Sequence, residues 1–145
     1  METFGSLLDK YSIQKIKIEK MKQSSIDANK IILVEDQINN LKNEINDYIS
    51  SAINGDIILQ EPKYKFYQGE NPSGLSFINI SDAIDNLFKT NYTLWNLEDK
   101  RRDKNAPDSD IRIICDDVAK FNRIRNDSMD KINELFNSLV NKWIK

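Results

Sequence analysis

Histidine is absent from the 145 residues of this chain, and cysteine occurs once, at Cys115. Without histidine, the chain lacks the side chain that most often acts as a general base near neutral pH and most often binds metals. A single cysteine cannot form a disulfide within the chain, which fits a reducing compartment. Proline occurs three times and glycine four times. Few positions therefore interrupt regular structure, and long helices are expected.

Long apolar runs and an excess of positive charge are missing as well. No apolar segment approaches the roughly eighteen residues of a membrane-spanning helix, and no signal-peptide core is evident. We therefore expect a bacterial cytoplasmic protein with no membrane partner, the Asn-, Ile- and Lys-rich composition indicating an AT-rich genome. The net charge of −2 gives no overall attraction to nucleic acid. The 39% hydrophobic and 30% charged content is typical of one soluble domain.

Apolar spacing predicts a first helical hairpin over about residues 3–53, with its turn near Ser24 and Ser25. In its second helix, apolar residues recur three and four positions apart, as in a helix that packs along one face. Gly55 is expected to end this helix, because glycine readily adopts the left-handed conformation found there. The recurring apolar residues are Ile31, Val34, Ile38, Leu41, Ile45, Tyr48 and Ala52.

A second hairpin is predicted over about residues 81–143, with a short turn at Pro107. Ser81 is the expected cap of its first helix, and Asp108 or Ser109 that of its second. Between the hairpins, a crossover over about 54–80 is expected to pack its aromatic side chains on the helices. Those aromatics are Tyr64, Phe66 and Tyr67. The predicted fold class is all-α: one domain over residues 1–145 that forms an antiparallel four-helix bundle.

The two halves also show a weak internal similarity. It indicates either a duplication with pseudo-two-fold symmetry or a chance match between Asn-rich helices. The matching positions are Leu8-Asp9 with Ile84-Asp85, and Asn39, Lys42, Asn43 and Asp47 with Asn122, Arg125, Asn126 and Asp130. The arginines set the halves apart, because all five lie between Arg101 and Arg125. Arginine offers a planar fork for carboxylate or phosphate, whereas lysine is a hydrated point charge.

Polar residues interrupt the apolar pattern of the second hairpin at Asn91, Glu98, Arg125 and Ser128. A buried polar group without a partner costs about 1–3 kcal/mol, so these groups must pair with one another or line a solvated pocket. Both alternatives stay open, since buried Asn and Arg–Glu groups also fix helix pairing. The candidate ligand-binding residues are Asn91, Trp95, Glu98, Asp99, Arg102, Asn122, Arg125, Asn126 and Asp127. Cys115 is expected to be a small buried apolar residue, and Trp95 and Trp143 are expected to pack in the core or at its rim.

The pattern Leu94-Trp95-x-x-Glu98-Asp99-x-x-Arg102, followed by Asn122-x-x-Arg125-Asn126-Asp127, resembles the bacterial family domain of unknown function 4254. The similarity covers mainly residues 80–135, with a fainter likeness near the N-terminus. It implies a small all-helical cytoplasmic protein without an established activity, some relatives being encoded near glycosyltransferases. It also implies that Trp95, Glu98, Asp99, Arg102, Asn122, Arg125, Asn126 and Asp127 are motif residues. The family often has histidine where this chain has Asn96, which removes a metal or acid–base role there.

Three functions fit these observations. The first is a non-enzymatic binding module whose arginine and amide side chains recognise an anionic small molecule or an acidic protein partner. The second is a Mg²⁺-dependent all-α nucleotide hydrolase with ligands among Glu98, Asp99, Asp127 and Asp130. Adjacent Glu98 and Asp99 point about 100° apart on a helix, which disfavours it. The third is a scaffold whose long helices associate with themselves, as in a homodimer, or with a partner. It is favoured by the uninterrupted apolar pattern of the second helix and by the apolar C-terminal residues, which are Leu135, Phe136, Leu139, Val140 and Trp143. No cofactor is expected apart from Mg²⁺ under the second function.

Overall fold

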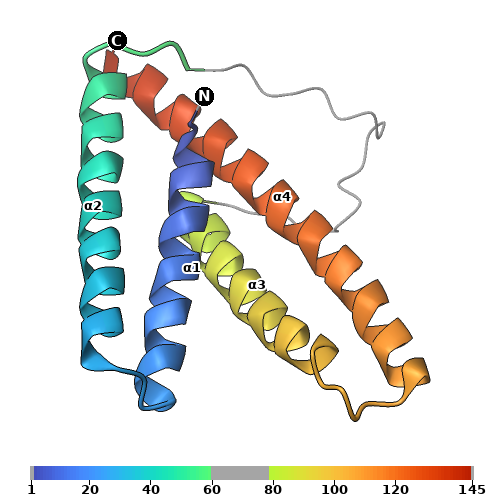
Figure 1. Cartoon of the computed structure of the whole chain (residues 1–145). Helices are drawn as coiled ribbons and strands as arrows, with labels where there is room; N and C mark the ends of the chain where they lie inside the picture. The colour runs from blue at the N-terminus through green and yellow to red at the C-terminus, as the bar shows by residue number, and fades with distance from the viewer. Residues whose placement is uncertain (1, 60–78, 145) are drawn as a thin grey trace.

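The computed structural model describes residues 2–59 and 79–144, which form four α-helices and no strands. The helices are α1 (Phe4–Gln23), α2 (Ala28–Ile53), α3 (Ile80–Arg101) and α4 (Asp108–Ile144). The predicted all-α four-helix fold is confirmed. Figure 1 shows α2 running back alongside α1, and α4 running back alongside α3. No helix of the described ranges has both the length and the apolarity needed to cross a membrane.

Capping side chains set the starts of the first two helices. The Thr3 hydroxyl accepts a hydrogen bond from the Ser6 backbone N–H at 3.1 Å, and the Ser6 hydroxyl accepts one from the Thr3 N–H at 2.9 Å. The Asp27 carboxylate accepts from the backbone N–H of Asn29 at 3.0 Å. These bonds pair N–H groups that have no partner within the helix. Gly55, with φ of 75°, follows the end of α2 as predicted.

The predicted caps of the second hairpin are wrong. Asn79 caps α3, its side chain accepting from the Asp82 N–H at 2.9 Å, whereas Ser81 lies inside the first turn. Extended backbone at Asn79 places its side chain over the helix end, as an N-cap requires. α4 begins at Asp108, directly after Pro107, so Asp108 and Ser109 are helical residues. The Pro107 carbonyl accepts from the Ile111 N–H at 3.1 Å, so Pro107 itself occupies the cap position.

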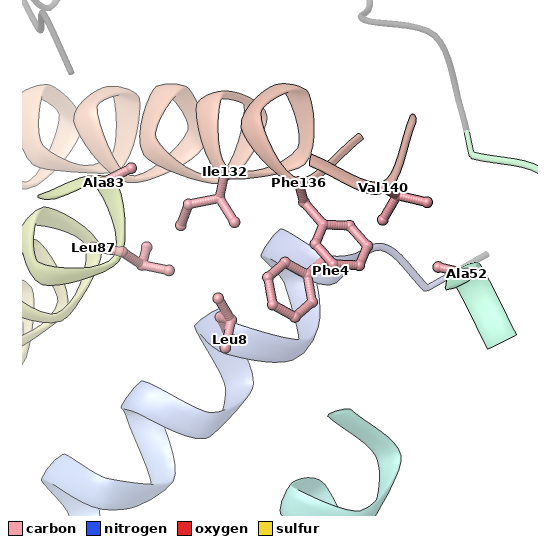
Figure 2. Packing of buried hydrophobic residues seen from close by; sticks show 8 residues of the cluster. All are labelled: Phe4, Leu8, Ala52, Ala83, Leu87, Ile132, Phe136 and Val140. Atoms are coloured by element: carbon pink, nitrogen blue, oxygen red, sulfur yellow. The ribbon is translucent and has the colours of Figure 1, made fainter. Parts of the chain in front are cut away.

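α1 is the central helix of the molecule (Figure 1). It lies between α2 and α3 and contacts all three other helices, as α4 also does, whereas α2, in the described ranges, contacts α1 and α4 but not α3. Two apolar clusters result. The larger joins all four helices (Figure 2) and consists of Phe4, Leu8, Ala52, Ala83, Leu87, Ile132, Phe136 and Val140. The smaller joins α1 and α2 through Ile18, Met21, Val34 and Ile38.

Gly5 marks the closest approach of α1 to α4. A Cβ atom added there would lie 2.5 Å from the backbone carbonyl oxygen of Met129 and 3.0 Å from the Asn133 side-chain oxygen. The Gly5 backbone N–H also donates to the Asn133 amide oxygen at 2.7 Å. Any larger residue would push the two helices apart, so the absence of a side chain at this position fixes their spacing.

Two expectations about α4 are corrected by the structure. Cys115 is exposed rather than buried, because it lies one residue, about 100° of helix turn, beyond the inward-facing Ile114. Trp143, expected to pack in the core or at its rim, is 78% exposed, whereas Phe136 and Val140 of the same helix are buried. The expected packing of Tyr64, Phe66 and Tyr67 falls outside the described residues.

Candidate functional site

A buried ion pair joins α1 to α4. The carboxylate of Asp9, in the second turn of α1, receives two hydrogen bonds from Arg125 of α4: Nε to Oδ1 at 2.8 Å, and Nη2 to Oδ2 at 2.5 Å. The side chain of Asp9 is 6% exposed and that of Arg125 is 32% exposed. The hydrogen bond to Asp9 raises the pKa of the Arg125 guanidinium, although partial burial acts in the opposite direction. In this bidentate geometry, Nε and Nη2 of the guanidinium each bind one oxygen of the same carboxylate.

α3 completes the cluster through Asn91, which is also buried. The amide nitrogen of Asn91 donates to Asp9 Oδ1 at 2.9 Å and to the Ser12 hydroxyl oxygen at 2.6 Å. The Ser12 hydroxyl in turn donates to the backbone carbonyl of Asp9 at 2.8 Å. The buried carboxylate therefore receives three hydrogen bonds from two other helices. We call Asp9, Ser12, Asn91 and Arg125 the polar cluster.

A further polar contact ties α3 to α4 on the N-terminal side of Asn91. Asn86 donates from its amide nitrogen to the Ser128 hydroxyl at 3.0 Å, and Ser128 donates to the backbone carbonyl of Ile124 at 2.8 Å. Ser128 is fully buried. Because a misplaced helix would leave such groups without partners in the core, these contacts favour one relative position of α3 and α4.

Glu98 and Asp99, the candidate acids of the second hairpin, pair with arginines other than Arg125. Glu98 pairs with Arg101 of its own helix at 2.7 Å, and Asp99 lies 3.9 Å from Arg102. The reason is axial distance. Asn91 and Arg125 meet at the level of Asp9, and Glu98 lies two helical turns further along α3, about 10 Å away. Asp9 reaches Arg125 from α1 instead.

The remaining candidate residues lie on α3 and α4, the two helices that carry Asn91 and Arg125. Trp95 and Asn122 are partly buried, Asn126 is exposed, and Asp127 is 7% exposed. Asn96, next to Trp95, accepts a hydrogen bond from Lys20 at 3.1 Å, which makes it part of the α1–α3 contact. Of the nine predicted residues, the structure thus brings Asn91 and Arg125 together, through the Asp9 carboxylate that both bind.

Asp9 and Ser12 were missed by the sequence reasoning, although the sequence holds a signal for them. Gly5, Asp9, Ser12 and Ile16 are spaced four, three and four residues apart, and all four are buried. A helix face made of a glycine, an aspartate and a serine is too polar to look like a core face, so apolar periodicity alone passes over it. The small residues at 5 and 12 would instead have indicated a close helix contact.

The internal similarity and the magnesium site gain no support from the structure. Asp9 is buried and Asp85, its matched position, is exposed; Arg125 is paired, and Lys42, its counterpart, is exposed. The duplication stays a prediction. Within residues 2–59 and 79–144, no group of three or more acidic or cysteine side chains is placed to hold a metal ion. The four carboxylates considered as Mg²⁺ ligands therefore form no such group.

No protein-family model, curated protein or solved structure matches the chain. The resemblance of residues 80–135 to domain of unknown function 4254 therefore stays a prediction. Function has to be inferred from the polar cluster and from the surface of this chain.

Proposed function

We propose that this chain is a non-enzymatic, helical protein-interaction module. One observation carries the proposal: the core-facing apolar stripe of α4 continues beyond the core. Ile132 and Phe136 of this stripe are buried, whereas Leu139 is 41% exposed and Trp143 is 78% exposed. The spacing of four, three and four residues keeps all four side chains on one face of the helix.

Two isoleucines at the end of α2 accompany this exposed part of the stripe. Ile53 is 45% exposed and Ile58, just after α2, is 86% exposed. Figure 1 shows the end of α2 beside the end of α4, and Ala52 and Val140 belong to the same apolar cluster. We call Ile53, Ile58, Leu139 and Trp143 the C-terminal surface. Apolar groups gathered at one place on a protein surface are typical of protein-binding sites.

The polar cluster supports a structural role more than a ligand-binding one. Both sides of the Asp9 carboxylate are bonded to Arg125, so an anionic ligand that used this fork would have to displace a buried carboxylate. Removing one partner of a buried ion pair costs about 3–5 kcal/mol, which a ligand would have to supply in addition to its own binding. In this proposal, the polar cluster holds the helices that present the C-terminal surface.

Site-specific photo-crosslinking in the cells that naturally make the protein tests this function. A photoreactive amino acid at position 143 is expected to give protein adducts. The matched control is position 33, because Leu33 is also an exposed apolar residue, at 62%, and lies near the start of α2, remote from the end that carries the C-terminal surface. No adducts from position 143, or equal adducts from both positions, would overturn the proposal.

An anion screen tests the alternative that the arginine fork binds a ligand. Thermal unfolding is measured with phosphate, sugar phosphates and nucleoside triphosphates, on the native chain and on Arg125→Lys. A protein-interaction module is expected to show no saturable rise in Tm. A saturable rise that Arg125→Lys abolishes would instead support the anionic ligand, because ligand binding stabilises the folded state by mass action.

A further inference from the structure

The C-terminal surface has the chemistry of a contact with a second copy of itself. Its apolar centre comes from two adjacent segments, the end of α4 and the residues that end α2. In a two-fold dimer the same patch lies on both sides of the contact, so it must be complementary to itself. Apolar side chains meet this condition, since each can pack on its own equivalent.

The charges at the edge of this surface are also self-complementary. Asp56 lies on the α2 side and Lys142 on the α4 side; both are exposed, and neither has an ion pair among the described residues. A two-fold axis through the apolar centre would bring Lys142 of one copy towards Asp56 of the other, twice. Lys131 and Glu134, about two to three turns before Lys142 in α4, already pair with each other at 3.3 Å. The residues beside Leu139 on the outer face, Ser138 and Asn141, are neutral.

The size of the surface fits a modest dimer. An aromatic side chain buries about 150–250 Å² on contact, and Trp143 is 78% exposed. Trp143 and Ile58 together supply much of the apolar centre of an interface. The usual size of a protein–protein interface is about 800 Å² per partner. Tryptophan, with tyrosine and arginine, is also among the residue types enriched where binding energy is concentrated at the centre of such contacts. An apolar centre of this size supports a dimer that forms in a concentration-dependent way rather than an obligate dimer.

We propose that the C-terminal surface binds a second copy of this chain in a two-fold contact, with Trp143 and Leu139 at its centre and Lys142 paired with the partner's Asp56. This inference rests on the proposed function and specifies its partner. The dimer forms by addition to a monomer whose own core is complete, because Phe136 and Val140 are already buried within the chain.

Sedimentation velocity over a hundredfold range of protein concentration measures the association. The native chain is expected to pass from monomer to dimer. Trp143→Asp is expected to weaken the dimer by at least tenfold, while Ile113→Asp, a matched change at a residue 61% exposed near the other end of α4, leaves it unchanged. Both positions are exposed, so circular dichroism and Tm should show an intact fold in each variant.

A charge exchange tests the geometry of the contact. Lys142→Glu should weaken the dimer several-fold, and adding Asp56→Lys to it should restore most of the affinity, because the two changes invert both ion pairs together. As a second readout, Trp95→Phe leaves Trp143 as the only tryptophan. Its fluorescence emission should shift to shorter wavelength as the concentration rises.

The outcomes separate this inference from the function on which it rests. A strict monomer whose position 143 crosslinks to a different protein would overturn the dimer and retain the interaction module. A dimer that Trp143→Asp leaves intact, or binding of Trp143 to lipid vesicles by the monomer, would overturn the inference. A strict monomer with no adducts at position 143 would overturn both.

Discussion

Arg125 and Asp9 form one ion pair, yet their removal should have unequal effects on stability. Arg125→Met leaves behind a carboxylate whose side chain is only 6% exposed, with the Asn91 amide as its remaining side-chain donor. Breaking a buried pair in this way costs about 3–5 kcal/mol, because the orphaned charge stays out of water. Asp9→Asn leaves a guanidinium that is 32% exposed and can take water as a partner. Its cost should be smaller, about 1–2 kcal/mol.

The double variant Asp9→Leu/Arg125→Met separates pairing from packing. Replacing both charges with apolar groups removes the buried charge, so the loss of stability should be well below the cost of Arg125→Met alone. Asn91 keeps a partner in this variant, because it also donates to Ser12. The free energy of unfolding, measured with urea at neutral pH, gives all values, and the coupling follows from a double-mutant cycle.

Two results would refute this reasoning. If Asp9→Asn costs more than Arg125→Met, exposure does not decide which orphaned charge is tolerated. If Arg125→Met costs less than about 1 kcal/mol, the pair does not hold α4 on α1, since an uncompensated buried carboxylate must cost more than that. Arg125 would then be available for another role, and the anionic ligand would regain support.

Three further predictions concern packing, pH and exposure. Gly5→Ala should lower the free energy of unfolding, measured with urea, by about 1–3 kcal/mol, because the alanine Cβ would lie 2.5 Å from the Met129 carbonyl oxygen. The control Ser138→Ala, on the exposed face of α4, should change the free energy of unfolding by no more than about 0.5 kcal/mol. Burial raises the pKa of the Tyr48 phenol, and a hydrogen bond from the Phe4 backbone acts in the opposite direction. The stability that this phenol contributes is therefore complete below its unfolded pKa of about 10, and it is lost as the pH rises through the higher pKa of the folded state. Unfolding between about pH 9 and 11 should therefore depend less on pH in Tyr48→Phe, and equal dependence would contradict the assignment. Cys115 should react with a thiol reagent in the folded protein nearly as fast as in the unfolded chain; a strongly protected thiol would show that it is buried.

The sequence predicts much of the fold because helical periodicity is a local property. Val34, Ile38 and Ala52 recur at helical spacing and are buried, and Gly55 ends α2 where expected. Periodicity assigns the inner face of each helix, but not how far along the helix a neighbour covers it. Leu139 and Trp143 illustrate this limit, since they lie on the inner face of α4 at a level where no other helix covers them fully.

Half of the polar cluster was within reach of sequence reasoning. Asn91 and Arg125 stand out as polar residues at apolar positions of their helices, which is a local signal. Their partner Asp9 lies 116 residues from Arg125 in the sequence, and nothing local to Arg125 distinguishes it from the nearer Glu98. Choosing between these acids requires the axial level of each helix. That level is set by contacts such as the close approach at Gly5, which one sequence does not reveal.

The central position of α1 has a consequence for the order of folding. Of the four helices, α1 comes first in the chain, yet some of its partners are distant: Gly5 bonds to Asn133, and Phe4 stacks on Phe136 with ring centroids 4.1 Å apart. Contacts between distant residues form late and slow folding, because a long loop must close before they are made. During synthesis, the first helix therefore waits with an apolar surface and a lone carboxylate until Val140 has been added. Until then, the exposed apolar surface of α1 makes the incomplete chain prone to aggregation.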